Sequence, residues 1–298
     1  MAGGEKKRQH YVPQFYLKAF SADDSEPYNL FCYDMTEKSL FRSSTRNIAQ
    51  SSNFYDLSEE QALENLFEDM EREFAKVHEK IIQSKRISTL SRDEKYVMAH
   101  FLSHQYIRTR KFRDVVKQAS EHTLEVVDEE EGDEKARRAV EAGTTDEGAK
   151  HWHAQLMSNA LKGFADLLIQ MKWFLFVNET DYALWTSDHP VAIFNPINPE
   201  PDPEKGIKKR GTKVHVPLSN DIVLALYDPR EYFVKSECEE LTEKQHVDFQ
   251  NKLQVEHSHR QVYSADDDLA LAEDLVEENP EYADLDYSDD FPDHHSYE

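Results

Sequence analysis

The sequence predicts an α+β domain in which a small, mostly antiparallel sheet is packed by three or four helices, followed by a disordered acidic tail. Three observations lead to this class. Short apolar segments separated by turn residues recur along the chain and indicate antiparallel strands. Two long segments keep apolar residues at spacings of three and four behind helix-start signals. The chain has only eight glycines and neither glycine-rich phosphate-binding motif, which argues against Rossmann and P-loop architectures.

The first predicted elements are a short extended segment and a short helix between residues 8 and 20. Pro13 biases the residue before it toward extended geometry. After Pro13, apolar residues share one helical face: Phe15, Tyr16, Ala19 and Phe20. Two short strands, 28–33 and 39–41, follow around a polar turn.

Two long helices come next, and each opens with a capping box. The first has Ser58 at its cap and Gln61 three residues later, and its apolar face runs to about residue 83. The second has Ser91 at its cap and Glu94 three residues later. Its stripe turns polar halfway, which a pure core helix would not do: Val97, Phe101, His104, Gln105, Arg108 and Phe112.

Residues 121–150 are acidic and poor in aromatics, so we expect a helix end and an exposed insertion of weak order. A third long helix is predicted from about residue 151. It leads into an apolar segment from Trp173 to Trp185, which we interpret as a hairpin of two strands around a polar turn.

After a proline-rich surface loop, 195–211, alternating apolar residues predict a second hairpin over 213–227. A helix over about 241–256 and a short strand over 261–264 complete the elements. We therefore expect one domain over residues 8–268. Residues 269–298 read as an acidic, disordered tail that holds one helical-looking patch.

The formal net charge is −24, and it is unevenly spread. Residues 264–298 hold 14 Asp or Glu and no Lys or Arg, whereas the other 263 residues hold 45 acidic and 35 basic residues. Such a surface repels nucleic acid over most of its area, so nucleic acid could bind only through a local basic groove. Two explanations of the acid excess stay open: a halophilic host, or an acidic tail alone.

The composition also indicates the cellular location that we expect for the protein. The two cysteines, Cys32 and Cys238, provide neither a disulfide framework nor a zinc set. The first residues lack an apolar signal region, and no run of 18 apolar residues occurs. We expect a soluble, cytoplasmic protein without a membrane partner.

At several of these positions the chain resembles the uncharacterised Domain of Unknown Function 4238 (DUF4238) family of prokaryotes and some fungi. The most specific piece is H-Y-V-P-Q-F-Y-L at positions 10–17. Other matching pieces follow in the family's order, over roughly residues 8–268: 53–55, 105–108, 186–191, 217–219 and 251–264. His189 departs from the small polar residue expected there, so we do not expect its side chain to be essential. The resemblance implies no activity, because the family is named for its unknown function.

His10 and Asp188 are the candidate catalytic residues. A neutral imidazole at position 10 suits an acid/base role or a metal ligand, although a histidine bonded to the backbone, fixing the entry turn, is the simpler explanation. Asp188 follows a predicted buried strand, where a carboxylate can face a cleft as base or metal ligand. The simpler alternative is an Asx-type turn before Pro190.

The candidate substrate-binding residues are polar groups near these two. Arg108 and Arg113 can clamp a phosphate or a carboxylate, since guanidinium groups bind such anions bidentately. The alternative is that Arg108 pairs with Asp188 or another buried acid and holds a helix to the sheet. The remaining candidates are Gln9, Tyr16, Gln105 and Ser187.

These residues support two hypotheses. The first is a hydrolase acting on a phosphate-containing or nucleic-acid substrate, because one His, one Asp and several Arg occur together in the segments that carry the resemblance. A divalent metal is the cofactor it could use, although His100 and His104, spaced i, i+4, lack the Glu of an H-E-x-x-H motif. The second is a non-catalytic binding or interaction module, in which the same residues form a structural hydrogen-bond network.

Overall fold

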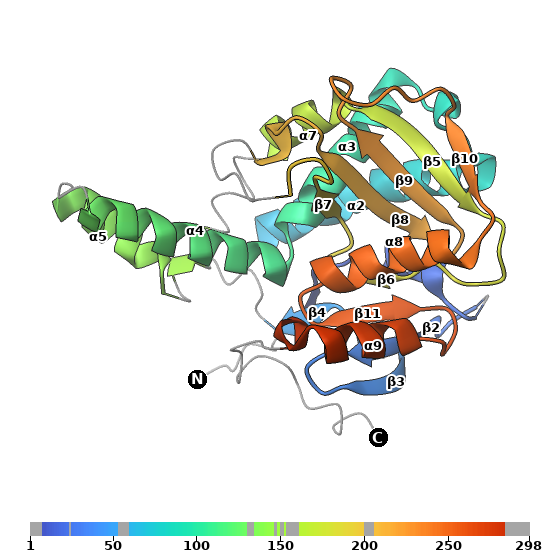
Figure 1. Ribbon diagram of the computed structural model, residues 1–298, viewed down its shortest axis with the longest axis horizontal. Helices are drawn as coiled ribbons and strands as arrows, with labels where there is room; N and C mark the ends of the chain where they lie inside the picture. Colours follow the sequence, from blue (N-terminus) through green and yellow to red (C-terminus); the bar gives the residue numbers. More distant parts are fainter. Residues whose placement is uncertain are drawn as a thin grey trace.

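A computed structural model of the chain describes residues 8–23, 25–52, 60–129, 134–145, 148, 149, 152, 161–199 and 206–283. Within these ranges two sheets and a two-stranded ribbon are surrounded by helices (Figure 1). The predicted α+β class is confirmed. No helix among the described residues is long and apolar enough to cross a membrane.

The larger sheet has five strands, and all neighbours are antiparallel except one parallel pair at its edge. In spatial order the strands are β10 (Cys238–Leu241), β5 (Lys172–Asn178), β9 (Ile222–Tyr227), β8 (Lys213–Ser219) and β7 (Ala192–Phe194). The β8–β9 pair confirms the hairpin predicted over 213–227.

The smaller sheet has four antiparallel strands. In order they are β3 (Ser39–Ser44), β2 (Asn29–Asp34), β11 (Gln261–Ser264) and β6 (Thr186–Ser187). The predicted strands at 28–33, 39–41 and 261–264 are confirmed. A separate ribbon pairs β1 (Arg8–His10) with β4 (Gln50–Ser52).

The hairpin predicted between Trp173 and Trp185 is wrong. Strand β5 pairs with β9 and β10 in the larger sheet, whereas β6 pairs with β11 in the smaller one. Residues 182–185 form no strand: Trp185 packs in the cluster around the smaller sheet, whereas Leu184 packs with Val223 of the larger sheet. A local pattern of two apolar segments and a polar turn does not specify which strands they will pair with.

Helices cover both faces of the larger sheet (Figure 1). Its core face packs against α2 (Glu60–Ser84), α3 (Arg92–Ile107) and α7 (Leu161–Ile169). On the other face, Val247 of α8 (Lys244–His257) packs with Val223 of β9. Helix α8 lies between the two sheets, so its residues can contact both.

The start of α3 confirms the predicted capping box. The Ser91 hydroxyl accepts a hydrogen bond from the Glu94 N–H at 3.1 Å, and the Glu94 carboxylate accepts one from the Ser91 N–H at 2.8 Å. The box predicted at Ser58 lies outside the described residues. Helix α3 ends at Ile107 and α4 (Arg110–Glu129) follows, so the stripe predicted to reach Phe112 spans two helices.

Helices α4 and α5 (Glu134–Gly143) project from the body (Figure 1). The described part of 121–150 is therefore largely helical, where weak order was expected. Ion pairs at i,i+4 spacing, such as Arg137–Glu141, support a helix of this composition. Residues 153–160, where a third long helix is predicted, lie outside the described residues.

The acidic C-terminal segment begins with an ordered helix. Helix α9 (Ala270–Glu278) buries Ala272, Leu275 and Val276 in the cluster around the smaller sheet. The helical-looking patch is thus part of the fold, which extends past residue 268. Residues 284–298 lie outside the described residues.

Candidate functional site

His10 is held by the ribbon β1–β4, in which it pairs with Gln50. Its Nε2 lies 3.2 Å from the Thr45 carbonyl oxygen. A carbonyl can only accept, so Nε2 carries the proton of the neutral ring and Nδ1 keeps the basic lone pair. Burial and the Arg108 charge lower the pKa of His10, and they outweigh the Thr45 and Arg46 backbone groups and Glu71, which raise it. The ring is therefore neutral at pH 7.

His10 lines an open groove of about 430 Å³, a volume sufficient for a small ligand. The wall is formed by the ribbon, by α1 (Gln14–Leu17) and by α2. It combines an imidazole, a carboxylate, a guanidinium and an aromatic ring: His10, Gln14, Phe15, Glu71, Arg72 and Ala75. This composition suits a ligand with an anionic group.

Arg108 lies at the end of α3 and contacts two residues that line the groove. Its Nη1 lies 2.8 Å from the Glu71 carboxylate, and its Nη2 donates to the His10 carbonyl oxygen. The Arg108 side chain is only 4% exposed, whereas that of Glu71 is 29% exposed. The sequence left open a pair between Arg108 and Asp188 or another buried acid. The structure pairs Arg108 with half-buried Glu71, and this pairing holds two walls of the groove together.

Asp188 lies directly after β6 and is almost fully buried. Its carboxylate accepts backbone N–H groups from three successive residues, at 2.7, 2.8 and 3.0 Å: His259, Arg260 and Gln261. Burial raises the pKa of Asp188, and this effect exceeds the opposing effects of His259 and the three N–H groups. The carboxylate thus binds a segment distant in sequence rather than the backbone before Pro190.

A second buried carboxylate lies on the other side of the same segment. Asp34, at the end of β2, accepts hydrogen bonds from Arg260 Nε at 2.8 and 2.7 Å and from Gln261 Nε2 at 2.8 Å. Burial raises the pKa of Asp34, but these hydrogen bonds outweigh it and hold the pKa below its usual range. Sequence reasoning missed Asp34 and Arg260. The available signal was an acid at the first position of the polar turn that follows the predicted strand 28–33.

The other predicted residues are engaged within the protein. Tyr16 donates to the Pro217 carbonyl at 2.5 Å, and its hydroxyl lies 2.9 Å from that of Thr186. The Ser187 hydroxyl donates to Gln254 at 2.9 Å, and Gln105 Nε2 donates to the Tyr11 carbonyl at 3.0 Å. All three side chains are buried.

Gln9 is buried in β1 opposite Ser51, and Arg113 lies half-buried on α4. The structure therefore brings His10 and Arg108 together, while Asp188 does not line the His10 groove. Within the described ranges, no group of three or more His, Cys, Asp and Glu side chains is placed to hold a metal ion.

A family model described as a protein of unknown function (DUF4238) matches residues 8–268. The chain belongs to the DUF4238 family. The DUF4238 match includes the His10 groove together with Asp34, Asp188 and the 259–261 segment, and it ends before α9. No curated protein and no solved structure matches the chain.

Proposed function

We propose that the protein is a hydrolase acting on a phosphate-containing substrate, with His10 as its acid/base residue. The observation that carries this proposal is a neutral imidazole whose Nε2 is bound to the Thr45 carbonyl, in a groove that Arg72 also lines. A backbone carbonyl on one ring nitrogen orients the imidazole and leaves the other nitrogen to take a proton.

The reaction is hydrolysis of a phosphate ester. A water oxygen attacks phosphorus, and its proton passes to His10 Nδ1. The bond from phosphorus to the leaving oxygen breaks, and that oxygen takes a proton from His10 or from water. Arg72 supplies positive charge for the phosphate at the groove. A nucleic-acid substrate would have to reach phosphorus through this local site, because the chain as a whole carries a charge of −24.

Asp188 has a different part in this proposal. Its oxygens accept three backbone N–H groups and it does not line the groove. We assign it a positioning role, in which it holds the 259–261 segment against β6. A direct catalytic or metal-binding role for Asp188 stays a prediction, and the assay below includes Mg²⁺ and Mn²⁺ for that reason.

A non-catalytic binding module is the second candidate, and one observation favours it. Tyr16, Gln105 and Ser187 are buried and hydrogen-bonded to other parts of the protein, as a structural network would be. In this case the His10 groove holds a phosphate-bearing ligand without turnover.

Turnover of two chromogenic probes, bis(4-nitrophenyl) phosphate and 4-nitrophenyl phosphate, separates the candidates. Wild type, His10→Gln and His246→Gln are compared with and without Mg²⁺ or Mn²⁺. The glutamine amide can still donate to Thr45, but it cannot accept a proton. We expect His10→Gln to lose at least ~100-fold in kcat, the scale of a lost general base. The exposed control His246→Gln should match wild type.

Absence of turnover in the wild type with both probes would overturn the hydrolase proposal. Equal turnover in wild type and His10→Gln would remove His10 from the mechanism. Thermal shift with 4-nitrophenyl phosphate then tests the binding module, since a ligand of the native state raises the melting temperature. Stabilisation that Arg72→Ala weakens would support binding without catalysis.

A further inference from the structure

A second pocket, of about 370 Å³, shares no lining residue with the His10 groove. It lies where the end of α7 meets η3 (Gly206–Lys208) and the turn after β9. Its apolar wall consists of Leu167, Met171, Ile207 and Pro229. A pocket of this size with one apolar wall is suited to the body of a small organic ligand.

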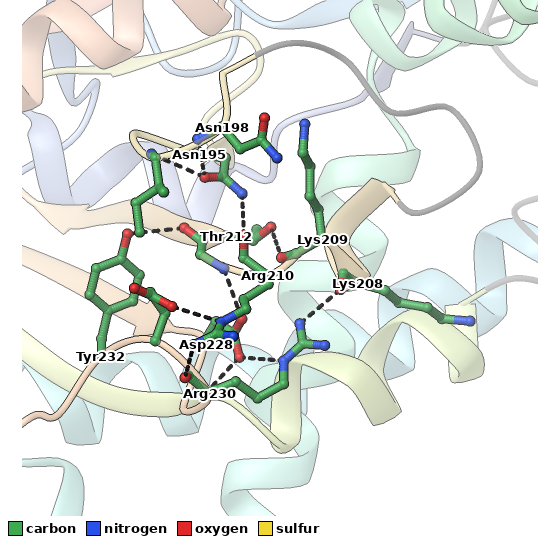
Figure 2. A network of polar contacts seen from close by, with 12 residues as sticks. Asn195, Asn198, Lys208, Lys209, Arg210, Thr212, Asp228, Arg230 and Tyr232 are labelled. Carbon is green, nitrogen blue, oxygen red and sulfur yellow. Dashed lines mark hydrogen bonds and ion pairs between the residues drawn. The ribbon is translucent and has the colours of Figure 1, made fainter.

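The polar wall is held in place by a network around Asp228 (Figure 2). The buried Asp228 carboxylate accepts the Gly211 N–H at 2.9 Å, the Arg230 N–H at 3.0 Å and Arg230 Nε at 2.9 Å. Arg230 also donates from Nη2 to the Lys208 carbonyl at 2.8 Å, which joins the turn to η3. These hydrogen bonds fix the polar wall of the pocket without a ligand.

Gly211 contributes to this network through its backbone. Its φ is +90°, a conformation that residues with a side chain rarely adopt. A Cβ there would also approach the Asn195 amide oxygen at 3.1 Å. A glycine therefore lets the N–H of this residue point at Asp228.

The charges that line the pocket leave an excess of positive charge. Lys208 and Arg230 are cationic, and Asp228 is the anion. Burial raises the pKa of Asp228, but the bonds from Arg230 and Gly211 outweigh it, so Asp228 is ionised and already compensated. The Lys208 side chain extends away from the network in Figure 2. Because Arg230 and Asp228 compensate each other, Lys208 gives the lining a net charge of +1, and on a chain of charge −24 this favours an anionic ligand.

We propose that this pocket binds a small anion with an apolar body, of the class of medium-chain carboxylates. The anionic head pairs with Lys208, and the chain lies against Leu167, Met171 and Ile207. This site is independent of the His10 groove, so it stands whether or not the hydrolase proposal holds.

Isothermal titration of the full-length protein with octanoate tests the site. Two reference compounds separate its components: 1-octanol has the apolar body without the charge, and inorganic phosphate has the charge without the body. We expect saturable octanoate binding, with each reference at least ~10-fold weaker. Lys208→Glu should weaken octanoate ~10-fold, the scale of one lost hydrogen bond to a charged group.

Lys235→Glu is the matched control, since it makes the same charge change at an exposed position outside the pocket. Its affinity for octanoate should equal that of wild type, and so should that of His10→Gln. Failure of octanoate to bind, equal binding of 1-octanol, or equal weakening by both lysine variants would overturn the proposal. Weakening by His10→Gln would place octanoate in the other groove, which also overturns it.

Discussion

Arg260 donates from Nε to both carboxylate oxygens of Asp34, at 2.8 and 2.7 Å, in a pair whose side chains are 9% and 0% exposed. The backbone N–H of the same arginine donates to Asp188 at 2.8 Å. One residue of the segment before β11 therefore joins the ends of β2 and β6. Since β11 lies between these strands, this contact fixes the centre of the smaller sheet.

Arg260→Ala should destabilise the protein strongly, because it leaves the Asp34 carboxylate buried without its cation. Removing one partner of a buried pair costs about 3–5 kcal/mol. Urea unfolding at pH 7 measures the loss. Arg42→Ala is the control, since its pair with Asp23 is well exposed and should shift the midpoint little. Equal shifts in the two variants would show that burial does not make the Arg260 pair important.

Asp188→Asn tests the positioning role. An asparagine keeps one acceptor oxygen but replaces the other with an NH₂ group that faces backbone donors. We expect a loss of about 1–3 kcal/mol in the free energy of unfolding, from unsatisfied buried donors. A variant that melts like wild type but loses turnover would instead support a direct catalytic role.

The stability of the protein should fall as the pH drops below neutrality. His78 donates from Nε2 to the Leu218 carbonyl at 2.7 Å, and burial lowers its pKa to about 4. The unfolded chain has a histidine pKa near 6.5, so it binds the proton more readily between these values. This one residue makes unfolding easier by about 2 kcal/mol on going from pH 7.5 to pH 5.

The variant His78→Gln checks this assignment. The glutamine amide can donate to Leu218 but does not titrate, so the loss of stability between pH 7.5 and pH 5 should shrink by that amount. Burial lowers the pKa of His215 to about 3, so this residue should still contribute to the loss of stability at low pH in the variant. His246→Gln, at an exposed position, should leave the pH dependence as in wild type. An unchanged pH profile in His78→Gln would contradict the assignment.

Ser91→Ala should cost about 1 kcal/mol, the usual value of a serine cap at a helix start. The Ser91 hydroxyl accepts from the Glu94 N–H, so the variant leaves that donor to water. Chemical denaturation detects the change. Ser91→Thr is the conservative control, because threonine keeps the capping oxygen, and a loss as large as that of Ser91→Ala would argue against the cap.

Local signals predicted local structure well. The capping box at Ser91, the hairpin of β8 and β9 and the short strand β11 each depend on residues within a few positions of one another. The structure has all three. Prediction failed where a segment had to select a distant partner. The segments at 173–178 and 182–185 fitted the pattern of one hairpin, but the first pairs with β9 and β10 and the second forms no strand.

For the candidate site too, the sequence predicted local features but not contacts between distant residues. His10, Arg108 and Asp188 were visible in the sequence as residue types, but their partners were not. Arg108 meets Glu71 across 37 residues, and Arg260 meets Asp34 across 226. Because Asp188 accepts from residues 71 to 73 positions away, no spacing rule could tell a buried carboxylate from one that faces a cleft.

The sequence by itself determined the α+β class, several helix and strand positions and the resemblance to the DUF4238 family. These follow from periodicity, capping and short motifs, which are encoded in neighbouring residues. Only the tertiary structure decided that His10 lines a groove, that Asp188 is enclosed by backbone N–H groups and that Lys208 and Arg230 share a pocket. The reason is physical: burial and charge compensation depend on which distant segments pack together, and a local pattern does not contain that information.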